Sequence, residues 1–154
     1  MYRITPAGYL TRLVNFPSGA FDGGPSLVPI LQANDGNLYG AIPNGGANAT
    51  GIIYKLTLDG QYTLLYTFPK GKNYSPMAVI EASDGNLYGA TLGLIAGGGS
   101  SELFRITTSG QYTLLRIMNF GLDGGCPCIL VRGSDGNIYG TAVSGGVTGG
   151  GRLQ

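Results

Sequence analysis

The sequence predicts an all-β protein, a β-propeller of four-stranded antiparallel blades with three blade-equivalents in the chain. The first observation is a motif of Asp-Gly-Asn, an aliphatic residue and Tyr-Gly. It occupies residues 35–40, 84–89 and 135–140, at spacings of 49 and 51 residues. The second is the glycine content, 29 of 154 residues, scattered between short aromatic and branched runs. Many short strands joined by glycine turns fit both observations, and no segment has helical periodicity.

Each repeat contains four apolar runs, which we letter A to D in blade order. The A–B turn is the Asp-Gly-Asn segment, because Asp-Gly between apolar runs favours a tight hairpin. The C–D turn ends on Gly8, Gly60 or Gly110 for the same reason, and this alignment sets Tyr9 in line with Tyr62. The runs are 30–31, 79–80 and 130–131 for strand A, the residues after the motif asparagine for strand B, 2–5, 54–57 and 104–107 for strand C, and 9–14, 62–66 and 112–117 for strand D.

The predicted strands lack a polar face. In residues 37–41, Asn-Leu-Tyr-Gly-Ala, apolar atoms fall on both alternate sides. This pattern is expected when each small sheet is covered on both faces by its neighbours, as propeller blades are. A solenoid of stacked strands is the alternative, but its repeats are usually shorter and lack two tight hairpins each.

The repeats are offset from the blades. They span approximately 1–52, 53–102 and 103–152, and in chain order they give C-D, A-B-C-D, A-B-C-D and A-B, with residues 152–154 where the next strand C begins. Propellers close with about four to eight blades, and a lone hairpin is marginal in water. We therefore expect a closed, head-to-tail homo-oligomer in which one chain's A-B completes the next chain's C-D. A dimer gives six blades and a trimer nine, and the sequence leaves both open.

The chain resembles a known family in its repeated pattern. Residues 54–57 (Tyr-Lys-Leu-Thr), Gly60, 64–68 (Leu-Leu-Tyr-Thr-Phe) and 83–90 (Ser-Asp-Gly-Asn-Leu-Tyr-Gly-Ala), followed by a glycine-rich loop, are similar to the bacterial GloVer tandem repeat. The resemblance covers nearly the whole chain. It implies a propeller-like fold, an extracellular or cell-surface location and repeat counts nearer nine blades than six, and it transfers no catalytic residue. With three repeats and neither signal peptide nor anchor recognisable, we expect a fragment, a minimal member or an engineered cut.

Composition argues against several kinds of function. Only 11% of residues are charged, the net charge is +1 and no basic patch appears, so we expect no nucleic-acid partner. No apolar run has the length of a membrane span, so no membrane partner is expected. The chain has no histidine, the commonest general base and metal ligand. We expect no catalytic residue, no metal and no cofactor, and we interpret the Asp-Gly-Asn segments as turns rather than Ca²⁺ loops.

Three further positions have structural interpretations. Cys126 and Cys128 have no partners for a zinc set, and Cys128 aligns with Met77 and Val28, so a small buried residue is favoured over redox chemistry. The basic residues of strand C are expected to pack their stems between blades while their heads reach water or a carboxylate. Polar residues of strand A would line a central channel if that strand is innermost. The basic residues are Arg3, Lys55 and Arg105, and the strand A residues are Gln32, Glu81 and Arg132.

The long B–C and D–A loops are predicted to share one rim, opposite the tight turns. Variable loops on a fixed scaffold commonly carry binding, and aromatic and polar residues together suit a glycan or a peptide, although solvated loops without a ligand are at least as compatible with the sequence. The function predicted is a non-catalytic, self-assembling scaffold or binding module. The alternative is a fragment of a propeller enzyme acting on polysaccharide, a lyase or hydrolase. The candidate binding residues are Phe21, Asp22, Lys72, Asn73, Tyr74 and Asp123.

Overall fold

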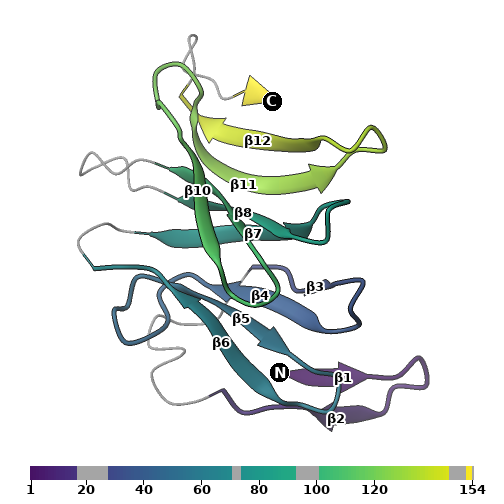
Figure 1. Cartoon of the computed structure of the whole chain (residues 1–154). Helices are drawn as coiled ribbons and strands as arrows, with labels where there is room; N and C mark the ends of the chain where they lie inside the picture. The colour runs from purple at the N-terminus through teal and green to yellow at the C-terminus, as the bar shows by residue number, and fades with distance from the viewer. Residues whose placement is uncertain (17–27, 71–73, 93–100, 146–151, 154) are drawn as a thin grey trace.

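The computed structural model describes residues 1–16, 28–70, 74–92, 101–145 and 152–153, with the side chains of 126–128, 143–144 and 152–153 excepted. These residues form strands in four antiparallel sheets and no helix (Figure 1). The all-β architecture of four-stranded antiparallel sheets predicted from the sequence is confirmed.

The four sheets follow one another along the chain, and within each sheet neighbours in sequence are neighbours in space. The N-terminal hairpin consists of β1 (Tyr2–Ile4) and β2 (Leu10–Arg12). The first blade consists of β3 (Leu31–Gln32), β4 (Leu38–Ile42), β5 (Ile52–Leu56) and β6 (Tyr62–Thr67). The second blade consists of β7 (Ser75–Glu81), β8 (Leu87–Leu92), β9 (Glu102–Ile106) and β10 (Tyr112–Ile117). The C-terminal sheet consists of β11 (Gly125–Arg132), β12 (Ile138–Ser144) and β13 (Arg152–Leu153).

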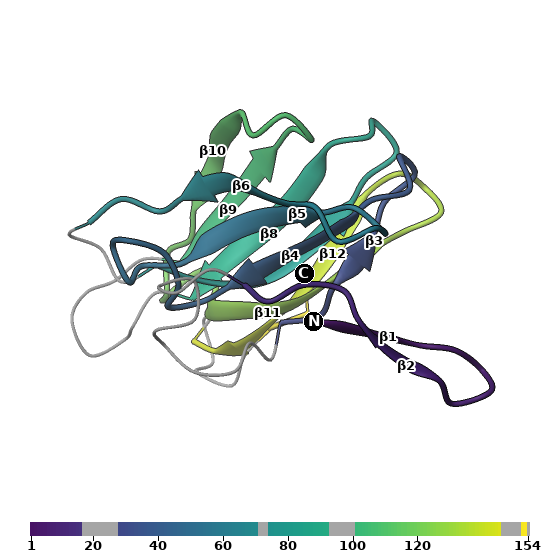
Figure 2. The same ribbon diagram turned by 90° about the horizontal axis from the view of Figure 1, so that it is seen from below.

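The sheets stack face to face in chain order (Figure 1). The A strands of neighbouring sheets contact each other, β3 with β7 and β7 with β11. Figure 2 shows the D strands β6 and β10 together at the opposite edge of the stack. Neighbouring sheets therefore converge at strand A, the arrangement in which propeller blades surround an axis.

The C–D turns correct one alignment made from the sequence. The amide of Thr5 donates to the carbonyl of Tyr9 at 3.0 Å, and the amide of Thr57 donates to the carbonyl of Gln61 at 3.1 Å. Strand pairing sets Ile4 opposite Leu10 and Leu56 opposite Tyr62. Tyr9 is thus equivalent to Gln61, and the alignment of Tyr9 with Tyr62 was wrong by one residue. Matching two tyrosines is less reliable than counting from the turn glycine, whose positive φ fixes the turn geometry.

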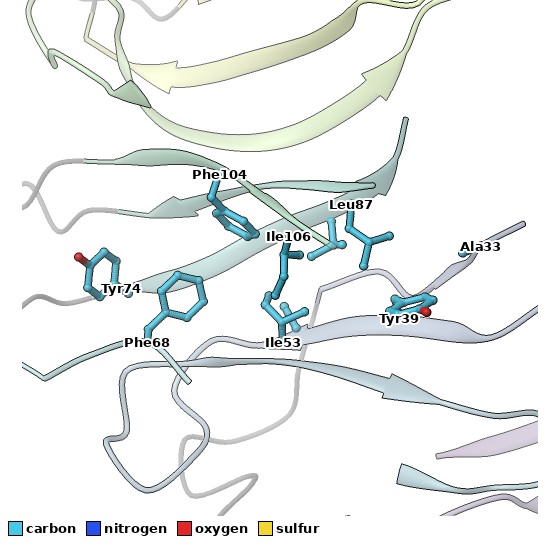
Figure 3. Packing of buried hydrophobic residues seen from close by; sticks show 10 residues of the cluster. Ala33, Tyr39, Ile53, Phe68, Tyr74, Leu87, Phe104 and Ile106 are labelled. Carbon is cyan, nitrogen blue, oxygen red and sulfur yellow. The ribbon is translucent and has the colours of Figure 1, made fainter. Parts of the chain in front are cut away.

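The main core lies between the first and second blades (Figure 3). Side chains from both facing sheets meet there and are fully or almost fully buried. The first and second blades each have a neighbouring sheet on either face, so apolar side chains on both faces of a strand can be buried. The labelled members are Ala33, Tyr39, Ile53 and Phe68 from the first blade and the segment after it, and Tyr74, Leu87, Phe104 and Ile106 from the second.

A smaller core joins the N-terminal hairpin to the first blade. Its buried members Ile42, Ile52, Tyr54 and Leu56 all come from β4 and β5. Met1, Val14 and Phe16 pack against them from the hairpin segment. The hairpin therefore covers the first blade in the same way as the first blade covers the second.

Candidate assembly and binding surfaces

Each A–B turn is organised by the aspartate of the repeated motif. One oxygen of Asp35 accepts a hydrogen bond from the amide of Asn37 (3.0 Å). The other accepts from Asn37 Nδ2 (2.9 Å) and from the hydroxyl of Tyr39 (2.7 Å). The same three bonds recur at Asp84 with lengths of 3.0, 2.8 and 3.0 Å and at Asp135 with lengths of 3.0, 2.7 and 2.7 Å. These bonds explain why Asp, Asn and Tyr recur together, and they support the interpretation of the motif as a turn.

These hydrogen bonds make stability depend on pH. The side-chain hydrogen bond from Asn86, followed by the backbone bond, holds the pKa of Asp84 below its usual value. Tyr139 and then Asn137 have the same effect on the pKa of Asp135. A carboxyl whose pKa is lower folded than unfolded stabilises the fold above the unfolded pKa, about 3.9, and loses that contribution as pH falls through the folded pKa.

We therefore expect the urea midpoint to be steady between pH 7 and about 5 and to fall below about pH 4. Urea unfolding followed by circular dichroism at several pH values measures this. Asp84→Asn should have a shallower fall than the parent, because one titrating group is gone. An unchanged slope would contradict the assignment of the acid sensitivity to these turns.

The glycine of the motif makes room for an aromatic ring from strand C. Gly40 pairs directly with Tyr54 across the sheet, and a Cβ at Gly40 would lie 2.5 Å from the Tyr54 hydroxyl oxygen. Gly89 pairs with Phe104 in the same way, and a Cβ there would collide with the Phe104 ring. In both complete blades the ring of strand C thus lies over a glycine of strand B.

An aromatic trio connects each of the two complete blades to the sheet before it. A single side chain after strand D of one sheet contacts two rings, from strands C and D, of the next. Ring centroids lie 5.1 and 5.6 Å apart at the first junction and 5.6 and 5.8 Å apart at the second, within the range of favourable aromatic pairs. The trios are Phe16 with Tyr54 and Tyr62, and Phe68 with Phe104 and Tyr112.

The two ends of the stack expose the residues that its interior buries. Tyr2 is 64% exposed, whereas Tyr54 at the same repeat position is 5% exposed; Ile4 is 61% exposed, whereas Leu56 is fully buried. At the other end Tyr139 is 47% exposed, and its equivalent Tyr39 is fully buried. The end sheets therefore present surfaces of the kind that adjoining blades cover inside the stack.

A cavity of about 250 Å³ lies between the second blade and the C-terminal sheet. Its lining is mainly apolar and comes from β8, β9, the β10 segment, β11 and β12. Met118 lines the cavity and occupies the repeat position of Phe68. The Phe68 amide donates to the carbonyl of Gly51, directly before β5, and the Met118 amide donates to the carbonyl of Ser101, directly before β9. The lining includes Gly89, Phe104, Leu115, Met118, Ile138 and Gly140.

A family comparison places the chain directly. The Gloeobacter/Verrucomicrobia repeat matches residues 1–154. The chain belongs to this family. The resemblance to a GloVer-type repeat stated from the sequence is confirmed. In this chain the Asp-Gly-Asn turn occurs in all three copies of the Gloeobacter/Verrucomicrobia repeat, and the ring over glycine and the aromatic trio occur in both complete blades.

The chain is similar to a solved structure, the crystal structure of selenomethionine-substituted virginiamycin B lyase from Staphylococcus aureus. It is 18% identical, with a TM-score of 0.61, and the match covers 99% of this chain and 47% of that one. The chain thus spans about half the length of that structure, and at this identity the likeness shows the fold alone, a β-propeller-like one. No curated protein matches the chain. Among the described residues, no helix combines the length and apolarity needed to cross a membrane.

Of the predicted binding residues of this repeat chain, Phe21, Asp22, Lys72 and Asn73 lie outside the described residues. The other two hold loops in place. Tyr74 is buried between the blades, and its hydroxyl donates to Glu102 Oε1 at 3.2 Å. Asp123 accepts hydrogen bonds from the Asn119 amide (2.8 Å) and from an Arg116 Nη (2.6 Å). The structure does not bring Tyr74 and Asp123 together.

Sequence reasoning missed Glu102, a buried carboxylate at the start of β9. It accepts hydrogen bonds from the hydroxyls of Tyr74 and Tyr112, both at 3.2 Å, and its amide donates to Thr91 Oγ1 at 3.0 Å. Burial, and then Glu102, raise the pKa of the Tyr112 phenol, so it remains a donor. The available signal was the departure from the repeat, since the first blade has Ile52 at this position.

Several polar side chains of strands A and C contact the A–B turns. Lys55 Nζ lies 3.8 Å from Asp35 Oδ2 and 6.0 Å from the centre of the Tyr39 ring, which confirms for Lys55 that its head reaches a carboxylate. On strand A, Glu81 Oε2 accepts from the amide of Asn34 (2.9 Å) and so links two blades. Gln32 Nε2 donates to the carbonyl of Gly36 (3.2 Å), and Arg132 is exposed. The side chains of Cys126 and Cys128 lie outside the described residues.

Proposed function

We propose that this chain is a non-catalytic propeller module that assembles with further copies of itself into a closed ring, which serves as a scaffold. The observation that carries the proposal is the contrast between equivalent positions. Tyr2, Ile4 and Tyr139 are exposed at the ends of the stack, whereas Tyr54, Leu56 and Tyr39, at the same repeat positions in the first blade, are buried.

The physical drive is burial of these apolar faces. Each Å² of apolar surface removed from water contributes about 25 cal/mol, so covering two complete end faces outweighs the loss of a few surface hydrogen bonds to water. Among the described residues, the two end sheets have two and three strands instead of four, and the strand edges that no described strand pairs with favour pairing with another chain. Contacts between opposite ends are head-to-tail, and they remain finite only if rotation closes the ring. Two chains give six blades and three give nine.

Ligand binding on the long-loop rim belongs to the same proposal. A rigid ring that presents variable loops suits a glycan or peptide. The described part of that rim exposes Lys70, Phe120 and Leu122, a mixture of charged and apolar side chains. The enzyme alternative, a fragment acting on polysaccharide, stays a prediction. The likeness to the solved lyase bears on that alternative only through the fold. Asp123 already accepts hydrogen bonds from Asn119 and Arg116.

The mass of the native protein in solution tests the assembly. At micromolar concentration we expect two or three times the mass of one chain by sedimentation equilibrium. Ile4→Asp should reduce it to the mass of one chain, because a carboxylate cannot be buried unpaired at the junction. Leu58→Asp, at an exposed position in the first blade's C–D turn, is the matched control and should leave the mass unchanged. If the folded parent has the mass of one chain at micromolar concentration, the proposal is refuted.

A further inference from the structure

The cavity beside Gly140 leads to a specific junction. We propose that the N-terminal hairpin of a second copy docks on the C-terminal sheet as its strands C and D, with Tyr2 in the cavity. The inference rests on the proposed assembly and names the surface that makes it. Its evidence is the pairing and packing that recur at the two complete junctions of the chain, together with the ion pair of Lys55 and Asp35 in the first blade.

Part of the β12 edge that faces β13 is available for a further strand, and its length matches that of β1. In the complete blades, strand C pairs with strand B from Leu38 to Ile42 and from Leu87 to Ala90. At the C-terminus, β13 pairs only with Thr141 and Ala142. No described strand pairs with 138–140 on that side, and β1 has three residues, Tyr2–Ile4.

The repeat fixes the register of docking. Tyr54 pairs with Gly40 and Phe104 with Gly89, so the second copy's equivalent residue, Tyr2, falls opposite Gly140. Arg3 then falls opposite Tyr139, and Ile4 opposite Ile138. Leu153 has the repeat position of Met1, so docking displaces β13, Arg152–Leu153, from β12. That cost is small, since β13 forms only two residue pairs.

The cavity matches the side chain that this register brings. In both complete blades an aromatic ring covers the motif glycine and contacts the residue that follows strand D of the preceding sheet, Phe16 or Phe68. At the third junction Gly140 is the motif glycine and Met118 is the residue that follows strand D, and both line the cavity. Tyr2, 64% exposed in the single chain, supplies the missing ring.

Charge and backbone packing agree with the same register. Arg3 has the repeat position of Lys55, which lies 3.8 Å from Asp35; docking sets Arg3 beside Asp135 of the other copy. Gly110 packs so closely on the preceding sheet that a Cβ would lie 2.8 Å from the carbonyl oxygen of Leu65. Gly8 at the equivalent position has nothing within 4 Å in the single chain and would meet the carbonyl of Leu115.

Disulfide cross-linking between two singly substituted proteins tests the register. Directly paired strand residues have Cα atoms about 4.5–5.5 Å apart, within the range that a disulfide spans. Mixing Arg3→Cys with Tyr139→Cys under mild oxidation should give a covalent dimer on a non-reducing gel. Each variant alone controls for Cys126 and Cys128, and Arg3→Cys mixed with Leu58→Cys controls for random collision. All three controls should give at least fivefold less dimer.

Gly140→Val is the second test, because its side chain occupies the space of the Tyr2 ring. We expect its mass to fall to that of one chain with unchanged far-ultraviolet circular dichroism. Gly121→Val, at an exposed loop glycine with negative φ, is the matched control and should keep the parent's mass. An assembled parent that gives no specific cross-link and tolerates Gly140→Val overturns this junction and leaves the ring standing. A single-chain parent overturns both. Stoichiometric binding of the apolar dye anilinonaphthalene sulfonate by a single-chain parent, lost in Gly140→Val, would assign the cavity to a small ligand instead.

Discussion

Phe104→Ala is expected to lower the free energy of unfolding by about 3–5 kcal/mol, the usual cost of removing a fully buried aromatic side chain. The Phe104 ring has no exposed surface. It contacts Phe68 and Tyr112, with ring centroids 5.6 and 5.4 Å apart, and it covers the backbone at Gly89. Removing it opens a cavity at the centre of the main core, where backbones held by two sheets cannot close in. Urea unfolding followed by circular dichroism gives the free energy.

The control for Phe104 is Tyr2, which occupies the same repeat position on the N-terminal hairpin. In the Gly140→Val background, where the hairpin does not dock, Tyr2→Ala should change the free energy of unfolding by no more than about 0.5 kcal/mol, as for other exposed positions. Both variants remove an aromatic ring at the same repeat position, and the two positions differ chiefly in burial. Equal losses for the two variants would show that the interior junction contributes no more than the exposed hairpin.

The sequence allowed prediction of those parts of the fold that depend on local chemistry. The Asp35 turn, its glycine and the strand after it are specified within six residues, and the structure has them at each of the three copies. The covered faces of the blades were also predictable, because strands with apolar atoms on both sides require two neighbours. Repetition made these inferences strong, since each pattern was seen three times.

The residues that sequence analysis missed act between sheets. Phe68 follows strand D and reads as the start of a loop, yet it contacts Phe104 and Tyr112 of the next blade. Phe16 has the same position before the first blade, but the equivalent at the next junction is Met118, so the aromatic residue recurs in only two of the three copies. Glu102 differs from its repeat counterpart, and only the three-dimensional packing sets it beside Tyr74. Contacts between segments far apart in the chain have no local sequence pattern to reveal them.

Gly89→Ala is expected to lower the free energy of unfolding by about 3 kcal/mol, at the upper end of the cost of overpacking a core. The new Cβ would collide with the Phe104 ring and lie 2.7 Å from the carbonyl oxygen of Ala78. Since Ala78 belongs to the paired strand β7, neither neighbour can retreat without breaking sheet hydrogen bonds. The gain of about 0.4–1 kcal/mol that alanine brings by restricting the unfolded chain does not offset this.

Two variants separate collision from the general effect of losing a glycine. Gly121→Ala, at a loop glycine whose added Cβ would lie 3.4 Å from Asn119 Oδ1, should change stability by about 0.5 kcal/mol or less. Phe104→Leu, combined with Gly89→Ala, should recover at least 1 kcal/mol relative to the sum of the two single losses, because contacting residues couple by about 0.5–3 kcal/mol. Thermal and urea unfolding of the four proteins provide the cycle. If the two losses simply add, collision with the Phe104 ring does not explain why strand B has a glycine at position 89.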